Sequence, residues 1–215
     1  MDFKKGIGHF IVQVDNPYIE EYDVKGHNGE KLVRDHRFND SDNAKRSGVI
    51  IKTAEGSGIP EGATLYFSHS IVEWREKTIS QPYCLDKKNH IYRVPYKPMD
   101  YPDRLAGKGY AWELDGKVES INHWIMLEQE TEDFEQTASG LFLVEKVEDV
   151  IYSSGENRPK KGYARVRFLN DYFRGMGLKE GDLVYHKKDA EYPIEINGKT
   201  YWRVFDDFLL AKVDE

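Results

Sequence analysis

One nine-residue phrase occurs twice in this chain of 215 residues, and it constrains the fold more than any other feature. GIPEGATLY runs from Gly58 to Tyr66, and GLKEGDLVY runs from Gly177 to Tyr185. Both segments read Gly, aliphatic, any residue, Glu, Gly, any two residues, aliphatic, Tyr. Two glycines and a tyrosine at fixed spacing rarely recur by accident, so the pattern predicts an internal repeat displaced by 119 positions (177 − 58 = 119).

Other segments recur in the same order. The matched pairs are HFIVQV (His9–Val14) with HWIMLE (His123–Glu128), RSGVIIK (Arg46–Lys52) with KKGYARV (Lys160–Val166), and IYRVPY (Ile91–Tyr96) with YWRVFD (Tyr201–Asp206). Their offsets are 114, 114 and 110. An unchanged order with drifting offsets predicts a duplicated unit with insertions and deletions in its loops.

Short runs rich in β-branched and aromatic residues dominate the sequence, and no convincing window has apolar residues at helical spacing with caps. Asp115-Gly116 and Asn197-Gly198 each separate two such runs. These dipeptides predict tight hairpins, because both central residues of the turn need positive φ. The pattern predicts an all-β protein with two small β-barrels related by the repeat, over residues 1–105 and 106–215.

Composition excludes several classes of function. The net charge of −7 disfavours general nucleic-acid binding. No apolar run approaches the roughly 20 residues that a membrane helix needs, and the N-terminus has no apolar signal core, so we expect a cytoplasmic protein without membrane contact. Cys84 is the single cysteine, which rules out an intramolecular disulfide or a multi-cysteine zinc site. It is expected to be a buried or half-buried thiol rather than a nucleophile.

Two long polar segments interrupt the strands at the same place in each half, over residues 16–45 and 130–161. Segments of this length without strand signals are usually functional or disordered. The second contains the apolar run GLFLV, Gly140–Val144, between acidic and small polar residues. The residues alone allow either a buried strand or a docking element at this run.

No motif for catalysis or metal binding is present. The seven histidines form neither H-x-H nor H-E-x-x-H, and the two at matched strand starts, His9 and His123, are expected to be structural. No G-x-G-x-x-G follows a strand, which argues against the dinucleotide-binding half of an alcohol-dehydrogenase-type enzyme. We therefore expect no enzyme activity, catalytic residue, metal or cofactor.

The second half resembles the GroES-type co-chaperonins. The resemblance rests on LKEGDLVYH (Leu178–His186), IEINGKTYWRV (Ile194–Val204) and DDFLLAKVDE (Asp206–Glu215), with HWIMLEQ similar to the first strand of the family and SGLFLVE to its mobile loop. It covers roughly residues 121–215, and residues 10–100 more loosely. The tandem arrangement is similar to two-domain co-chaperonins of chloroplasts and to divergent ones carried by bacteriophages. Without a transit peptide, a bacterial or phage origin, and so the host cytoplasm, is favoured.

The resemblance implies a co-chaperonin that caps a GroEL-type chaperonin ring in an ATP-dependent cycle and assists protein folding. The residues implied to bind the chaperonin are Gly140, Leu141, Phe142 and Leu143, with Leu32 and Val33 as weaker counterparts in the first half. It also implies self-association into a ring through the terminal strands, HWIML or FLLAKV. Seven chains in two tiers, or fewer chains giving six or eight domains, remain open. Tyr172, Met176 and Trp202 depart from the family pattern.

The alternative is a non-catalytic β-barrel that serves as a structural or adaptor module and has borrowed the fold. Fold alone does not decide between the two, because one fold supports many functions. ATP-dependent co-migration with a chaperonin is the discriminating observation.

Overall fold

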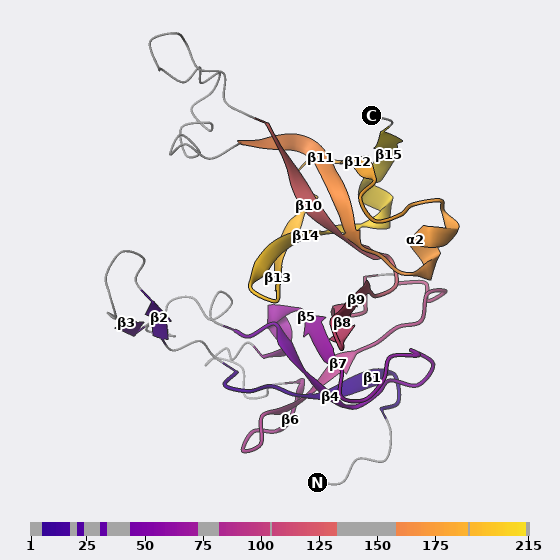
Figure 1. Cartoon of the computed structure of the whole chain (residues 1–215). Coiled ribbons are helices and arrows are strands. Elements are labelled where there is room, and N and C mark those ends of the chain that lie inside the picture. The colour runs from indigo at the N-terminus through magenta and orange to yellow at the C-terminus, as the bar shows by residue number, and fades with distance from the viewer. Residues whose placement is uncertain are drawn as a thin grey trace. The chain divides into compact units, whose positions relative to one another are not determined.

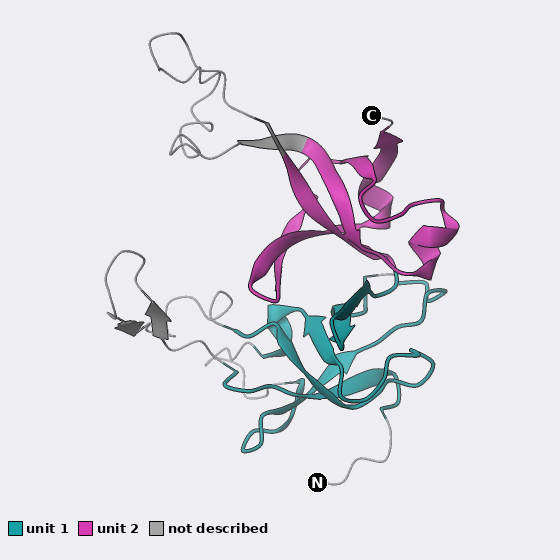
Figure 2. Ribbon diagram, viewed as in Figure 1, with its two compact units in different colours: residues 1–122 teal, residues 123–215 magenta. Residues whose placement is uncertain are grey.

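The structure is a computed structural model that describes residues 6–17, 21–23, 31–33, 44–72, 82–103, 105–132, 158–188 and 190–213, with the backbone alone at residues 21–23, 31–33, 131–132 and 158–161. The chain forms two compact units, Met1–Asn122 (unit 1) and His123–Glu215 (unit 2), coloured separately in Figure 2. Each unit is described below by itself.

Unit 1 contains a seven-stranded antiparallel sheet with the strand order β6-β7-β1-β4-β5-β8-β9 (Figure 1). Its strands are β1 (His9–Gln13), β4 (Ser47–Lys52), β5 (Thr64–Phe67), β6 (Cys84–Asp86), β7 (Ile91–Pro95), β8 (Gly109–Leu114) and β9 (Lys117–Ser120). A short 3₁₀ helix, η1 (His69–Ile71), follows β5. Between β1 and β4, β2 (Glu21–Asp23) and β3 (Lys31–Val33) form a separate two-stranded ribbon.

Unit 2 contains a six-stranded antiparallel sheet with the strand order β13-β14-β10-β11-β12-β15. Its elements are β10 (Trp124–Glu132), β11 (Arg158–Phe168), α2 (Asp171–Gly175), β12 (Leu183–His186), β13 (Tyr192–Ile196), β14 (Lys199–Phe205), η3 (Asp206–Phe208) and β15 (Leu209–Val213). The prediction of a strand-dominated chain is confirmed.

The two sheets share one topology. The order of the first sheet becomes that of the second when each strand is replaced by its counterpart: β6 by β13, β7 by β14, β1 by β10, β4 by β11, β5 by β12 and β8 by β15. β9 has no counterpart in the second sheet. The irregularities also match, because the register shifts between Ile11 and Val12 of β1 and between the equivalent Met126 and Leu127 of β10. Strand order and register therefore confirm the internal repeat.

The repeated phrase is the same turn in both units. Gly62 and Gly181 have φ of +86° and +87°, a region that favours glycine. The Gly62 amide donates to the Ile50 carbonyl and the Gly181 amide to the Val166 carbonyl, both at 2.8 Å. The tyrosines that end the phrase, Tyr66 and Tyr185, then pair with Ser47 and Tyr163.

The match between HFIVQV and HWIMLE was wrong by one residue. Val12 pairs with Ile50, and Leu127, not Met126, pairs with the equivalent Val166. Leu127 belongs to the core of unit 2 as Val12 belongs to that of unit 1, whereas Met126 lies on the opposite face. A one-residue shift exchanges the two faces of a strand, so the residues that are buried decide the alignment, not the similar residue types in the sequence. His123 therefore corresponds to Gly8 rather than to His9.

The match between RSGVIIK and KKGYARV was wrong by two residues. Val49 pairs with Thr64, and the equivalent pair is Arg165 with Leu183. Gly48 therefore corresponds to Ala164, not to Gly162. A shift of two keeps the same face inward, so the alternation of apolar residues could not reveal it.

The division between the units falls after Asn122, not after residue 105. β8 pairs with β5 of unit 1, and β9 pairs with β8 across the Asp115-Gly116 turn, so this hairpin belongs to the first sheet. Asp115 and Gly116 have φ of 53° and 81°, and Asn197 and Gly198, which join β13 to β14, have 53° and 74°. Both predicted hairpins are confirmed.

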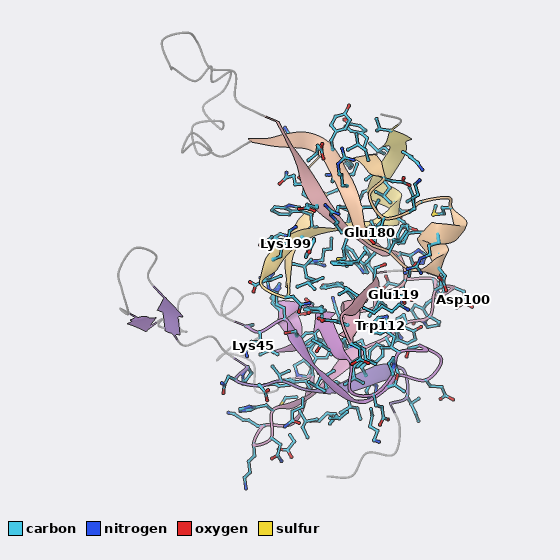
Figure 3. All side chains as sticks on the ribbon, viewed as in Figure 1. Lys45, Asp100, Trp112, Glu119, Glu180 and Lys199 are labelled. Atoms are coloured by element: carbon cyan, nitrogen blue, oxygen red, sulfur yellow. The ribbon has the colours of Figure 1, made fainter. Side chains whose placement is uncertain are left out.

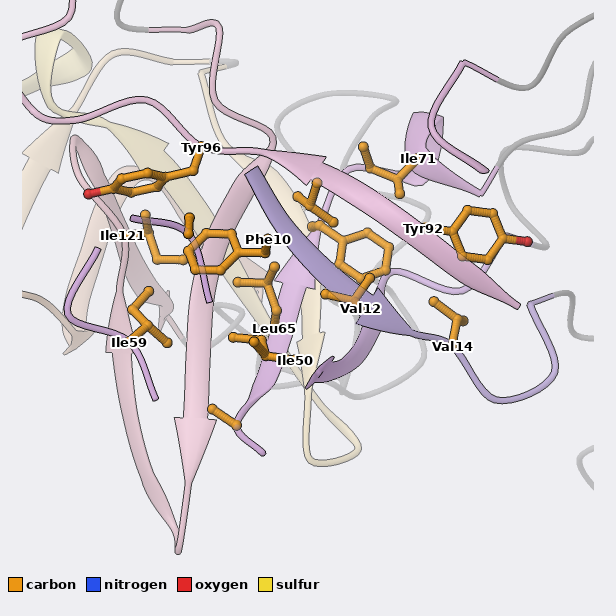
Figure 4. Close-up of a cluster of buried hydrophobic side chains, with 14 of the residues drawn as sticks. Phe10, Val12, Val14, Ile50, Ile59, Leu65, Ile71, Tyr92, Tyr96 and Ile121 are labelled. Carbon is orange, nitrogen blue, oxygen red and sulfur yellow. The ribbon is translucent and has the colours of Figure 1, made fainter. Parts of the chain in front are cut away.

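Each unit has its own apolar core, made largely by alternate residues of its sheet. In unit 1, the fully buried Phe10, Val12 and Leu65 lie within it, and Tyr96 meets the Phe10 ring edge-on at 5.3 Å between centroids (Figure 4). In unit 2, Ile125 and Phe173 are fully buried in the corresponding cluster. Burying one such side chain stabilises the fold by about 1.5–3 kcal/mol. Of the described helices, none is long and apolar enough to cross a membrane.

We expect Gly62→Ala and Gly181→Ala to destabilise the protein by similar amounts, about 1–2 kcal/mol each, because an added Cβ disfavours positive φ. An added Cβ would meet nothing within 4 Å at either position, so the loss comes from the backbone alone. Urea unfolding measures it. Gly107→Ala is the control, since its Cβ would lie 3.8 Å from the nearest atom at an ordinary φ. A loss confined to one of the two turns would contradict their equivalence.

Candidate partner-binding segments

The four residues predicted to dock a partner, Gly140, Leu141, Phe142 and Leu143, lie outside the described residues. The strand residues on either side of the segment that contains them are described. Glu132, the last residue of β10, pairs directly with Arg158, the first residue of β11. Residues 133–157 are therefore held at both ends by one antiparallel pair.

Leu32 and Val33, the weaker candidates, lie in β3, where Leu32 pairs with Tyr22 and Val33 with Glu21. Both residues therefore belong to a paired strand.

In unit 2, the strands that carry the long segment extend beyond the sheet. β14 pairs with β10 only as far as Leu127, and β12 pairs with β11 only from Tyr163 to Arg165. Thr131 and Glu132 pair only with Pro159 and Arg158 among the described residues, and Figure 1 shows these strand ends running past their neighbours. We call these four residues the stalk.

Charged side chains link the strands next to the stalk. Arg165 donates from Nε to Glu130 Oε2 at 2.9 Å and from Nη2 to Oε1 at 3.2 Å, a two-point contact between β11 and β10. Arg167 bonds Glu128, and Lys199 Nζ of β14 donates to Glu128 Oε1 at 2.7 Å. Lys199 is labelled in Figure 3. The hydrogen bond from Lys199 is the main cause that lowers the pKa of Glu128; burial opposes it, and Arg167 adds to it.

This network was missed from the sequence, although a signal for it exists. Glu128 and Glu130 alternate along one strand, and Arg165 and Arg167 alternate along the next. Opposite charges at a spacing of two on adjacent antiparallel strands lie on one face and pair. Apolar alternation, which predicts the strands, carries no information about this charged face.

The two units differ at the sheet edge formed by β8 in unit 1 and by β15 in unit 2. In unit 1 the outer edge of β8 is covered by β9, with Trp112 opposite Glu119. In unit 2 the corresponding strand β15 pairs with β12, and no described strand lies on its other side. Leu210 of β15 is 57% exposed. Of the two predicted edge segments, FLLAKV is at an edge, whereas HWIML is in β10 between β14 and β11.

β15 is tied to the repeated turn by an ion pair. Lys212 Nζ lies 2.8 Å from Asp182 Oδ2, which also accepts the Lys179 amide at 2.9 Å. Burial raises the pKa of Asp182, but the hydrogen bonds from Lys212 and Lys179 outweigh it and lower the pKa overall. The ionised carboxylate thus fastens the edge strand to the turn.

A polar cluster specific to unit 2 surrounds His123. Its Nδ1 lies 2.8 Å from Asp206 Oδ2, and the Tyr172 hydroxyl donates to the same oxygen at 2.8 Å. Both His123 and Asp206 are buried. The equivalent positions in unit 1 are Gly8 and Tyr96, which keep only the backbone hydrogen bond that joins Asp206 to His123. The unusual Tyr172 thus helps to hold the start of β10 against η3.

Features that would support catalysis or metal binding are few in the described part of the chain. No three His, Cys, Asp or Glu side chains there form a metal-binding group. Cys84 is half-buried, within the expectation, and burial raises the pKa of its thiol, which keeps the unreactive protonated form. His27 and His36 lie outside the described residues.

No known protein family and no curated protein matches this chain.

We expect Asp182→Asn to weaken unit 2 at neutral pH and to have a smaller effect in acid. The folded pKa of Asp182 lies below its ordinary value of 3.8, so the stability from the carboxylate is complete above that value and is lost as the pH falls through the folded pKa. Urea midpoints of wild type and variant should therefore differ at pH 7 and converge below pH 3.8. Asp171→Asn is the control, because the Asp171 side chain is 99% exposed. A constant difference across this range would contradict the ion pair.

Proposed function

We propose that this protein is a co-chaperonin that caps a GroEL-type chaperonin ring in an ATP-dependent cycle, and that each unit is a small GroES-like barrel. The observation that carries the proposal is the apolar run Gly140–Val144 within a segment whose two ends are fixed on paired strands. A single core assembled from the strands of one sheet supports the barrel in each unit.

The tethering suits a reversible contact. Leu141 is nine residues beyond Glu132 (141 − 132 = 9), so an extended chain carries it at most about 30 Å from the stalk. Burying Leu141, Phe142 and Leu143 in an apolar groove is worth about 1.5–3 kcal/mol for each side chain, and fixing each residue of the segment costs about 1–2 kcal/mol. One segment therefore binds weakly, and several on one assembly bind together with high effective concentration.

The contact between β8 and β9 suggests how such an assembly forms. By the offset of 115 that aligns Gly8 with His123 (123 − 8 = 115), β9 corresponds to residues 2–5. We propose that residues 2–5 of a second copy cover β15 as β9 covers β8. The register of the internal pair would place Phe3 opposite Val213, and Lys4 opposite Lys212, whose charge Asp182 already neutralises.

A closed ring built from this contact alternates the two kinds of unit and contains an even number of them. The contact is head-to-tail, so the angle between successive units decides whether and where it closes. A cytoplasmic location and the absence of a bound cofactor are part of the same proposal.

We expect Leu141→Ser combined with Phe142→Ser to abolish ATP-dependent binding to a purified double-ring chaperonin while leaving thermal stability nearly unchanged. Serine removes the apolar area that docking would bury, and the proposal places Leu141 and Phe142 outside both cores. Co-migration with and without ATP measures binding. The control, Leu32→Ser with Val33→Ser, should have a smaller effect. Unfolding of the first variant would assign the run to a core, and a stable variant that still binds would place the contact elsewhere and favour the adaptor alternative.

We expect removal of residues 2–5 to convert a ring of chains into single chains at micromolar concentration, because β15 then has no strand to cover it. Native mass measurement gives the number of chains directly. Ile7→Ser is the control, since Ile7 is 75% exposed and adjoins the removed residues without belonging to them. A full-length chain that is monomeric, or a shortened chain that keeps the ring, would contradict the contact.

A further inference from the structure

The stalk of unit 2 has little to stabilise it by itself. It consists of two residue pairs, Thr131 with Pro159 and Glu132 with Arg158, that lie beyond the strands on either side. A two-stranded ribbon is marginally stable in water, and its ends open with local free energies near zero. Interactions at its base therefore decide how much of the time the stalk is formed.

The base of the stalk is irregular in the backbone. Between Gln129, which pairs with Ala164, and Thr131, which pairs with Pro159, the register shifts. On β11 this interval contains Gly162, with φ of +80°. A Cβ at Gly162 would lie 2.7 Å from the Tyr185 ring and 3.2 Å from the His186 carbonyl, so the bulge is pressed against β12. Such bulges bend a strand and set its direction.

Arg165 spans this bulge. Its guanidinium holds both carboxylate oxygens of Glu130, the β10 residue between the two registers, and its Nη1 donates to the Gly181 carbonyl at 3.3 Å. It therefore connects β10, β11 and the repeated turn. A two-point contact fixes orientation as well as distance, which a lysine in the same place could not do.

The equivalent positions in unit 1 lack the arginines of this network, although Asp15 takes the place of Glu130. The register places Val49 where unit 2 has Arg165, Gln13 where it has Glu128, and Ile51 where it has Arg167. Val49 is 44% exposed, an aliphatic side chain in the position of the clamp. β1 ends at Gln13, whereas β10 continues to Glu132. The charged network and the extension of the strands occur together in one copy of the repeat and are absent together from the other.

We propose that Glu130 and Arg165 are positioning residues that hold the stalk in line with the sheet, so that β10 and β11 leave the sheet in a preset direction in unit 2. The geometry of the stalk stands by itself, whereas its effect on partner binding rests on the proposed function.

Hydrogen exchange in the absence of any partner tests the stalk. In an antiparallel pair the amides of neighbouring residues point to opposite edges, so either those of Glu132 and Arg158 or that of Thr131 cross the stalk. Glu130→Gln and Arg165→Gln should each speed exchange at the crossing amides by about threefold to tenfold, the range for loss of a partly exposed ion-pair network. Amides of Ile125 and Leu127 should stay protected. The exchanged pair, Glu130→Arg with Arg165→Glu, should restore much of the protection. The control, Glu61→Gln, removes an ion pair with Lys52 in unit 1 and should change nothing at the stalk.

Salt separates an electrostatic clamp from simple packing. At about 1 M salt, where charges are screened within about 3 Å, wild-type stalk exchange should rise toward that of Glu130→Gln, and the variant should change little. Stalk exchange that is unaffected by both substitutions and by salt would overturn the proposal.

Chaperonin binding tests the presentation. Arg165→Gln should weaken ATP-dependent binding several-fold, and the exchanged pair should recover part of it. Faster stalk exchange with unchanged binding would overturn the positioning role. If the wild-type chain binds no chaperonin at all, the proposed function fails, and the exchange measurements still decide whether Glu130 and Arg165 hold the stalk.

Discussion

The hydrogen bond from the Gly62 amide to the Ile50 carbonyl, and its counterpart from Gly181 to Val166, fix how the strands of each sheet align. Each glycine has a positive φ, which turns the chain sharply enough for its amide to reach the preceding strand. The return bonds, from Ile50 to Ala63 and from Val166 to Asp182, complete the alignment. Once β4 and β5, or β11 and β12, are in register, β1 and β10 can bury only one of their two faces, and the remaining strands follow from that choice.

Local signals allowed much of the fold to be predicted from the sequence. The repeated turn, the two hairpins at Asp115-Gly116 and Asn197-Gly198, and the strand-dominated character depend on residues within a few positions of one another. The alignment of β1 with β10 was off by one residue, because the similar letters of His9 and His123 do not decide which face is buried. The contact that does decide it, between Val12 and Ile50, joins residues far apart in the sequence.

The candidate site was predictable to a different degree. The apolar run at Leu141–Leu143 is visible in the sequence alone, and its docking role stays a prediction. The clamp of Glu130 and Arg165 was not found, because it requires the register of β10 against β11 and a bulge that no short pattern identifies. The contacts of the Asp206 carboxylate with His123 and Tyr172 could not be predicted for the same reason, since the three residues come from three separate segments.

The hairpin of β8 and β9 has a consequence for the order of events during synthesis. β9 follows β8 after a two-residue turn, so the outer side of β8 is covered by a local contact that can form as soon as Ser120 has been made. Unit 1 can therefore complete its sheet, with β6 and β9 as the outer strands, before any strand of unit 2 exists. The outer side of β15 has no such neighbour among the described strands. Unlike β8, β15 therefore gains no local strand that covers it during synthesis.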